Sequence, residues 1–314
     1  MNVSILIPCF NASRFIIDTL DSAINNMEPG DEIVLVDDHS TDDSLSKATC
    51  FLRGTDVPHQ IVTNTRKGGC AARNLALHLA KGSLIQWLDA DDLLGSAKLT
   101  IQRQHLHQGG KALVVSPFQT FVEKPNESEA NKECGWLYPS QPSPADWLAS
   151  ENKAVIHCWL GNREVFETAG LWDTSLQVNQ DGEYFARALA AANQLHVETR
   201  VQAFYRKGIS GSVSQFTAEK APSLFKSIQA IQKTALSVED SPRMRQMISN
   251  RWQHFIYTTF PHAPELRRQA QRRLKELPRP TLSNPQTVSK SSQFFSRIFG
   301  WKALMRIRQI RGQI

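Results

Sequence analysis

The sequence predicts an α/β fold in which a mostly parallel sheet is covered by helices on both faces. Two observations support this prediction. Short apolar runs with the composition of doubly buried strands occur at residues 3–8, 32–36, 60–63 and 84–88. Between them, apolar residues recur at helical spacing over residues 11–26, 42–52 and 69–80. This alternation is typical of parallel strands joined by crossover helices.

The early elements also have start and stop signals. The first helix is predicted from apolar residues that share one face: Phe15, Ile16, Leu20, Ala23 and Ile24. Asp42 has the residue type of an N-cap for the second helix. Gly82 closes the third helix, and the fourth strand runs into an acidic turn at residues 89–92.

After residue 99 the pattern is less regular. Residues 112–115 fit another strand, and 123–145 form a polar, proline-containing loop that we expect near a site. Helices are expected near 163–169 and 181–193, and the periodicity is helical from 222 to 277. We therefore expect an α/β domain at 1–220, a helical extension at 221–277, a linker at 278–292 and a basic amphipathic helix at 293–314.

Composition excludes several classes of protein. Of 314 residues, 41% are hydrophobic and 21% charged, which excludes a disordered or fibrous chain. No run approaches the ~18 apolar residues of a membrane span, and the short N-terminal apolar run lacks the basic flank of a secretory signal. Five scattered cysteines without a CxxC pair argue against a disulfide framework or structural zinc and favour a reduced, cytoplasmic setting.

Charge is unevenly distributed along the chain. From Arg243 onward there are 15 Lys and Arg against two acids, a net +13, which leaves −7 for the first 242 residues of a chain whose formal charge is +6. A basic region suggests an anionic membrane, nucleic acid or polymer, although a solvated helical face has the same composition. Residues 293–311 combine aromatic residues with five cations, as in helices that lie on anionic lipid at the inner face of the plasma membrane. Docking on the rest of the chain or dimerisation would use the same stripe. Since no nucleic-acid recognition motif accompanies the charge, we expect no nucleic-acid partner.

Polar residues follow three of the predicted strands. They are the segment 8–11, the pair Asp37-Asp38, and the turn 89–92 with three aspartates. The carboxyl ends of parallel strands form the ligand-binding edge of such sheets, and paired carboxylates repel each other unless a cation lies between them. Magnesium or manganese, shared with substrate phosphates, suits such carboxylates. A dehydrogenase and a P-loop NTPase are disfavoured because neither glycine-rich phosphate motif is present.

Three ordered blocks carry a family resemblance: SILIPCFNASRFIIDTLDS, IVLVDDHSTDDS and GGCAARNLALHLAKGSLIQWLDADD. Together they resemble the family 2 glycosyltransferases of GT-A fold, over residues 2–100 strongly and 155–215 moderately. The resemblance implies an inverting transfer from a nucleotide diphospho-sugar, assisted by Mn²⁺ or Mg²⁺.

The resemblance also implies roles for individual residues. Pro8, Phe10 and Asn11 would lie under the base and ribose, Asp38 would pair with the uracil imide, and Arg73 would contact the base or diphosphate. Asp89 would reach the ribose or the metal, and Asp91 would bind the metal. Structural roles are the alternative. Asp37 could cap a turn, Asp92 could start a helix near Ser96, and Arg73 could pair with a carboxylate. His39 stands where the family has glycine; a positive φ there would cost modest strain.

In the second half, the family's Glu-Asp pair is represented by Gln180-Asp181. We expect Asp181 to be the general base, with Glu183 as its rival. Asp181 could instead N-cap its helix, whose dipole would lower its pKa. Trp159 is expected either to stack on a sugar or to pack in the core, and His157 to be structural. The segment 206–212 resembles one that closes over the diphosphate; a glycine-rich surface loop is the alternative.

These observations together predict a glycosyltransferase that uses a UDP-sugar and a glycan or lipid-linked acceptor. Two alternatives stay open. One is a nucleotide-sugar-binding protein that has lost catalysis, which the Gln180 substitution keeps in view. The other is a nucleotidyltransferase, for which residues 8–15 lack the glycine-rich basic loop.

Overall fold

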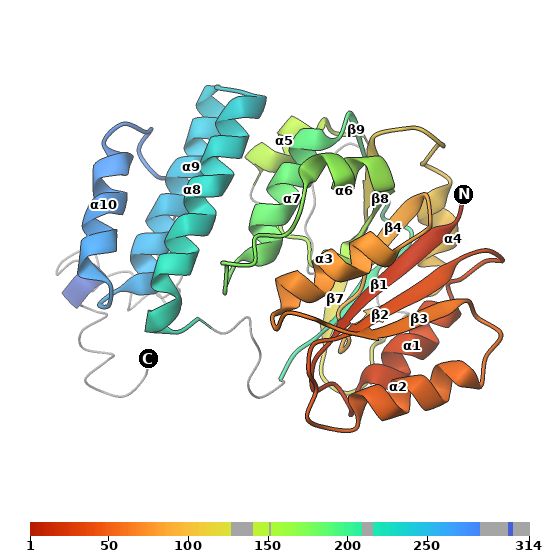
Figure 1. Ribbon diagram of the computed structural model, residues 1–314. Coiled ribbons are helices and arrows are strands. Elements are labelled where there is room, and N and C mark those ends of the chain that lie inside the picture. Colours follow the sequence, from red (N-terminus) through yellow and green to blue (C-terminus); the bar gives the residue numbers. More distant parts are fainter. Residues whose placement is uncertain (127–140, 151, 209–215, 283–300, 304–314) are drawn as a thin grey trace. The chain divides into compact units, whose positions relative to one another are not determined.

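The structure, a computed structural model, describes residues 1–126, 141–150, 152–208, 216–282 and 301–303. The chain forms two compact units, drawn together in Figure 1. The first comprises Met1–Leu176 and Gln180–Val213, and the second Gln177–Asn179 and Ser214–Ile314. Residue 220, where we expected the first domain to end, closes the 3₁₀ helix Ala218–Lys220 that precedes the long helices of the second unit.

The first unit is built on a seven-stranded sheet of order β3-β2-β1-β4-β8-β6-β9. Its strands are β1 (Val3–Cys9), β2 (Glu32–Asp37), β3 (His59–Thr63), β4 (Leu84–Trp87), β6 (Ala112–Val115), β8 (Trp159–Asn162) and β9 (Gln194–Val197). The four predicted N-terminal strands pair in parallel, which confirms the expected α/β class. β8 runs antiparallel between β4 and β6.

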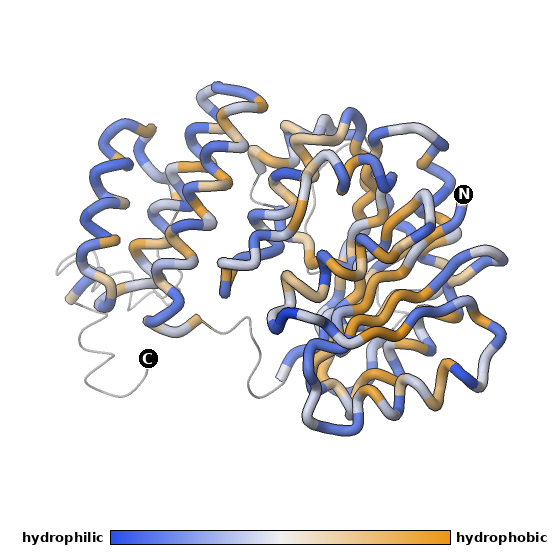
Figure 2. The backbone as a smooth tube through the Cα atoms, in the orientation of Figure 1, coloured by the Kyte–Doolittle hydropathy of each residue, from blue (hydrophilic) through white to orange (hydrophobic). Residues whose placement is uncertain are grey.

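Helices cover both faces of this sheet. The crossovers α1 (Ile16–Ile24) and α2 (Ser44–Arg53) lie on one face, and α3 (Gly69–Leu79) and α6 (Arg163–Ala169) on the other (Figure 1). The central strands are therefore enclosed, and every residue of β2 is buried. Figure 2 shows these strands as hydrophobic bands at the centre of the unit. Full burial of each large aliphatic side chain contributes roughly 1.5–3 kcal/mol, so the sheet is a rigid base for the turns that follow it.

A second, three-stranded sheet was not predicted. It has the order β5-β10-β7, with β5 (Leu93–Leu94), β7 (Phe118–Phe121) and β10 (Ala203–Arg206). β10 pairs in parallel with β7 and antiparallel with β5. Because β5 follows the acidic turn directly, this small sheet connects that turn to β10. The described part of the unit also contains the helices α4 (Lys98–Arg103), α5 (Pro144–Ala149) and α7 (Gln180–Ala191).

Two predicted helix starts are wrong. α1 begins at Ile16 instead of residue 11, because residues 10–12 turn away from the strand and Asn11 has a positive φ of 48°. α2 begins at Ser44 with Asp43 at the N-cap position. Asp42 still satisfies a free N–H of this helix, since its Oδ1 accepts a hydrogen bond of 3.0 Å from the Ser44 amide.

The second unit is helical, as expected, and its described part includes α8 (Ala221–Val238), α9 (Pro242–Thr259) and α10 (Pro264–Leu274). Prolines in the first turns of all three helices mark their starts. Residues 278–282 of the predicted linker lie against α9, where the Thr281 amide donates to Asn250 Oδ1 at 2.9 Å. Of the predicted helix 293–314, only 301–303 are among the described residues, and the Trp301 ring packs 4.9 Å from Tyr257. No helix in the described ranges has the length and apolar character needed to cross a membrane.

Candidate donor and metal site

The carboxyl ends of β1, β2 and β4 meet at one edge of the sheet, as the strand order predicts. The Asp38 amide donates to the Cys9 carbonyl at 2.7 Å, and the Asn11 amide to Ser40 Oγ at 3.0 Å. Leu88, just before the acidic turn, donates to the Leu6 carbonyl at 3.0 Å. The three polar segments therefore lie next to one another at this edge of the sheet.

Asp38 is buried and held by donors from the loop before α3. The Gly68 amide donates to Oδ1 at 2.8 Å and to Oδ2 at 3.0 Å, and Asn64 Nδ2 donates to Oδ1 at 2.7 Å. A carboxylate has about four acceptor positions, so this one retains capacity for another donor. Asp37 instead accepts from the Ser40 amide at 3.2 Å, the turn contact named as its structural alternative.

The turn after β1 combines a constrained backbone with an exposed ring. Asn11 Oδ1 accepts a hydrogen bond of 2.8 Å from the Thr41 amide, which fixes this turn against the one after β2. Phe10 is 45% exposed, and Lys67 Nζ lies 5.5 Å from its ring centroid. Pro8 lies within β1, paired with Val36. His39 has φ 64°, the left-handed conformation that the glycine comparison anticipated.

Arg73 connects three segments that are far apart in sequence. Its Nη2 donates to Asp89 Oδ1 at 2.8 Å, and its Nη1 to Gln180 Oε1 at 3.3 Å at the start of α7. Its guanidinium lies 4.9 Å from the ring centroid of Trp172. Asp89 is thus its carboxylate partner, as the structural alternative for Arg73 anticipated, and that partner is itself a predicted site residue.

Trp172 and Asn74 were missed in the sequence, and both help to place Arg73. Asn74 Nδ2 donates to the Trp172 carbonyl at 3.0 Å and its Oδ1 accepts from the Trp172 amide at 2.8 Å. Trp172 also stacks on Tyr184 of α7 with centroids 3.9 Å apart. In the sequence, Asn74 stands out only because it follows Arg73 in the same predicted helix. That position does not identify Trp172, 98 residues away, as its partner.

Asp91 and Asp92 have different surroundings within the acidic turn. Burial, and next the charge of Asp89, raise the pKa of Asp91 to about 6. The Asp91 carboxylate is bonded to no other residue in the described part of the chain. Asp92 is buried, and its Oδ1 accepts from the Arg206 amide at 2.7 Å. The suggestion that Asp92 starts a helix is wrong, because α4 begins at Lys98 after Ala97.

The surroundings of Asp89 and Asp91 fit a divalent cation. Two carboxylates in one turn repel each other, and that of Asp91 accepts no hydrogen bond from another described residue. The charge of Asp89 raises the pKa of Asp91, and those of Arg206 and Arg73 lower it. Among the described residues, no group of three or more His, Cys, Asp or Glu could hold a metal ion. One or two carboxylates together with substrate phosphates are a usual magnesium or manganese set, and these two residues could supply the protein's part.

Asp181 and Glu183 differ in availability. Asp181 lies in the first turn of α7, and burial, together with the charge of Asp89, raises its pKa to about 6 against the lowering effect of Arg73. The net shift of this pKa is therefore upward, whereas the helix dipole was expected to lower it. Glu183 is 5% exposed and forms a double hydrogen bond with Arg187, at 2.7 and 2.8 Å. Asp181 is the carboxylate near Arg73 and Asp89.

Trp159, His157 and Arg206 lie in the protein interior. Trp159 is 2% exposed, with its ring stacked on Phe185 at 4.9 Å, so its surroundings match the core alternative and not a sugar platform. His157 is buried with Nδ1 3.2 Å from Asp92 Oδ2, and burial lowers its pKa to about 3. Arg206 is an anchor for the acidic turn, whereas 209–212 of the predicted closing segment lie outside the described residues.

Comparison with known proteins identifies the family. The sequence profile described as glycosyl transferase family 2 matches residues 4–170. The uncharacterized glycosyltransferase EpsJ of Bacillus subtilis is 26% identical over 217 residues, covering 65% of this chain and 61% of EpsJ. The poly(ribitol-phosphate) beta-glucosyltransferase of Bacillus spizizenii is 38% identical over 102 residues, 32% of this chain and 16% of that protein. The chain thus spans about three fifths of EpsJ and less of the second relative.

Solved structures show the same fold at low sequence identity. S. aureus TarS 1–349 in complex with UDP-GlcNAc superposes with a TM-score of 0.68 at 15% identity, covering 100% of this chain and 93% of that one. The mannosyltransferase PcManGT from Pyrobaculum calidifontis, in complex with GDP-Man and Mn²⁺, gives 0.57 at 15% identity, over 99% and 88%. These similarities confirm the predicted GT-A fold.

Proposed function

The chain belongs to glycosyl transferase family 2, and we propose that it transfers a sugar from a UDP-sugar to a hydroxyl of a polysaccharide or glycolipid, with inversion and metal assistance. The observation that carries this proposal is the junction made by Arg73. It joins Asp89, in the acidic turn, to Gln180, next to Asp181. The acidic turn, which we propose binds the donor, and the proposed base Asp181 are thus linked through one side chain.

The uridine would bind at the ends of β1 and β2. Asp38 retains an acceptor position for the imide N–H of uracil, while the Gly68 and Asn64 donors hold its carboxylate in place. Phe10 offers an exposed ring in the turn after β1, and Asn11 fixes the adjoining backbone. TarS has been solved with UDP and with UDP-GlcNAc, which supports a uridine donor for a chain of the same fold.

The diphosphate would lie over the acidic turn. Asp91 and Asp89 would hold Mn²⁺ or Mg²⁺, which when bound neutralises charge on the departing diphosphate. Arg73 adds a cation at the same place, since its guanidinium already faces Asp89. PcManGT, solved with Mn²⁺, supports a metal in this fold.

Asp181 would act as the general base. Its carboxylate takes the proton of the acceptor hydroxyl, whose oxygen forms a bond to the anomeric carbon opposite the diphosphate. The bond from that carbon to the phosphate oxygen breaks, and its electron pair leaves with UDP. A pKa of about 6 leaves Asp181 ionised at neutral pH yet basic enough to accept a proton.

Gln180 does not by itself argue for lost catalysis. Its Oε1 accepts from Arg73 at 3.3 Å and its Nε2 donates to the Leu176 carbonyl at 2.6 Å. A neutral amide can therefore orient Arg73 without adding a negative charge beside Asp181. An inactive binding protein is the alternative that the experiment below excludes or establishes.

The acceptor would be a cell-envelope polymer or a lipid-linked glycan. Relatives include the poly(ribitol-phosphate) beta-glucosyltransferase and a putative teichuronic acid biosynthesis glycosyltransferase, TuaG, 32% identical over 104 residues. The basic stretch 293–314 would contact anionic lipid at the inner face of the plasma membrane, which would place the enzyme near such an acceptor.

The test is turnover with a panel of nucleotide sugars, with and without mixed envelope glycans. We expect one UDP-sugar to release UDP with an acceptor present, and Asp181→Asn to bind that donor but lose at least ~100-fold of transfer. Donor binding without turnover by the unmodified chain would establish the inactive alternative. Pyrophosphate release from a nucleoside triphosphate would indicate a nucleotidyltransferase instead.

A further inference from the structure

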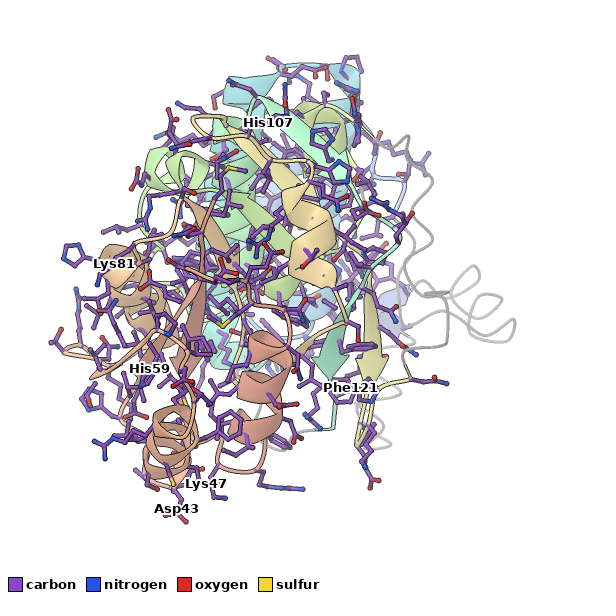
Figure 3. The ribbon with its side chains drawn as sticks, turned by 90° about the vertical axis from the view of Figure 1, so that its right-hand side faces the viewer. Asp43, Lys47, His59, Lys81, His107 and Phe121 are labelled. Carbon is purple, nitrogen blue, oxygen red and sulfur yellow. The ribbon has the colours of Figure 1, made fainter. Side chains whose placement is uncertain are left out.

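Arg206 is an almost fully buried cation at the end of β10. The residue is 6% exposed, and its guanidinium lies 4.6 Å from the ring centroid of Phe15 and 4.4 Å from that of Phe121. Figure 3 labels Phe121 at the end of β7, the strand that pairs with β10. Two aromatic contacts fix the position of the guanidinium.

The hydrogen bonds of Arg206 lead to the acidic turn. Its Nε donates to the Asp91 carbonyl at 2.8 Å, and its backbone amide donates to Asp92 Oδ1 at 2.7 Å. Its Nη1 donates to the carbonyls of Val122 and Glu123, at 3.3 and 3.2 Å. Arg206 therefore joins the acidic turn to the chain that follows β7.

These contacts do not form a strong ion pair. Among the described residues the guanidinium forms an ion pair with Asp18, whose carboxylate is 3.6 Å from Nη2 and is 63% exposed. A buried cation without a close carboxylate is not a source of stability, because its desolvation penalty is not offset by a close opposite charge. What the planar guanidinium supplies is several donors in a fixed geometry, aimed at backbone carbonyls.

We propose that Arg206 is a positioning residue for the metal and diphosphate site, acting by holding the Asp91 backbone from behind. This inference rests on the proposed function. The bond to the Asp91 carbonyl restricts the backbone rotation that sets the direction of the Asp91 side chain, and Asp92 is held by the same residue. Groups that orient metal ligands from outside typically account for ~10–100-fold in metal affinity.

The chain offers a matched control in Arg163. Its Nε donates to the Gly82 carbonyl at 2.8 Å, the same kind of bond, at the opposite end of β4. Arg163 and Arg206 each keep one buried Nη2 without a hydrogen bond among the described residues. Replacing Arg163 therefore removes a comparable guanidinium far from the acidic turn.

The experiment measures UDP binding by calorimetry, with and without Mn²⁺, in the unmodified chain, Arg206→Met, Arg206→Lys and Arg163→Met. We expect Arg206→Met to weaken UDP binding at least ~10-fold with Mn²⁺ and less than ~2-fold without it. Arg206→Lys keeps the charge but not the planar set of guanidinium donors. Its UDP affinity with Mn²⁺ should lie between those of the unmodified chain and Arg206→Met. Arg163→Met should bind as the unmodified chain does, even if its melting temperature falls.

Two results would overturn the inference. One is a folded Arg206→Met with full Mn²⁺-dependent binding; if that variant does not fold, full Mn²⁺-dependent binding by Arg206→Lys has the same force. The other is an equal loss with and without Mn²⁺. If UDP binding by the unmodified chain is independent of Mn²⁺, the proposed metal site itself is wrong. That result differs from one in which only the role of Arg206 is wrong, because the unmodified chain then still binds UDP more tightly with Mn²⁺.

Discussion

Arg73 Nη2 and Asp89 Oδ1 lie 2.8 Å apart, although one residue belongs to α3 and the other follows β4. Both side chains are largely shielded from solvent, with 10% and 27% of their surfaces exposed. Such a pair orders both groups before any ligand arrives. The same guanidinium reaches Gln180, so the acidic turn and the start of α7 share one cation.

Replacing Arg73 with Met should weaken UDP binding by at least ~10-fold, about 1.4 kcal/mol, because the change removes the cation that we propose faces the diphosphate. Calorimetry measures this directly. Arg103→Met is the control, since Arg103 also pairs with a buried carboxylate, Asp31, at 2.7 Å. Equal UDP affinity in folded Arg73→Met and in the unmodified chain would contradict the role assigned to Arg73.

Transfer should depend on pH through Asp181. Because the base must be ionised, kcat/KM at saturating Mn²⁺ should rise up to tenfold per pH unit below about 6 and level off above it. Asp181→Asn should abolish most of the activity and, with it, this rise of kcat/KM between low pH and about 6. Glu183→Gln should keep the rise, because Glu183 is paired with Arg187; loss of the rise in that variant would transfer the role to Glu183.

Lys98 should make the unfolding free energy depend on pH. Its Nζ donates to Gln86 and Gln102 at 2.9 and 2.7 Å, and burial lowers its pKa to about 7. Between pH 7 and about 10 the unfolded chain holds a proton that the folded chain has lost, so stability rises with pH, by at most about 1.4 kcal/mol per unit. Below pH 7 both states are protonated and this slope vanishes.

Denaturant titrations from pH 7 to 9.5 measure the effect. Lys98→Met should flatten the rise in unfolding free energy, whereas Lys81→Met should retain it. Lys81 is exposed, as Figure 3 shows. An unchanged slope in Lys98→Met would show that the rise comes from other groups.

His39 should be a site of small, removable strain. It holds φ 64° at an exposed turn position, and the left-handed conformation costs a residue with a Cβ about 1 kcal/mol or more relative to glycine. His39→Gly should therefore be more stable to urea than His39→Ala by about 1 kcal/mol. Equal unfolding free energies for the two variants would show that this turn does not impose the strain.

Strands that are buried on both faces could be predicted from the sequence, because β1, β2 and β4 are continuous apolar runs whose character is local. β8 could not, since Trp159–Asn162 becomes a strand only by pairing antiparallel with β4 and β6. The two-residue strand β5 likewise depends on β10, more than 100 residues away. Such pairings leave no periodicity within the segment itself.

The candidate site was predictable as a list of residues but not as a set of contacts. Strand ends placed Asp38, Asp89 and Asp91 at one edge. That Arg73 would bond to Asp89 and Gln180 at once, or that Arg206 would be buried behind Asp91, depends on packing that no motif records. For Trp159 the sequence left two environments open, because a tryptophan near a site motif can pack in the core or stack on a sugar. Its ring stacks on Phe185 in the structure.

The most direct test of the central claim is the affinity of UDP for the unmodified chain and for Asp91→Asn, each with and without Mn²⁺. If the acidic turn holds a metal that is shared with the diphosphate, Mn²⁺ strengthens UDP binding by at least ~10-fold in the unmodified chain and leaves it unchanged in Asp91→Asn. An equal effect of Mn²⁺ on both proteins, or none on either, would contradict the account.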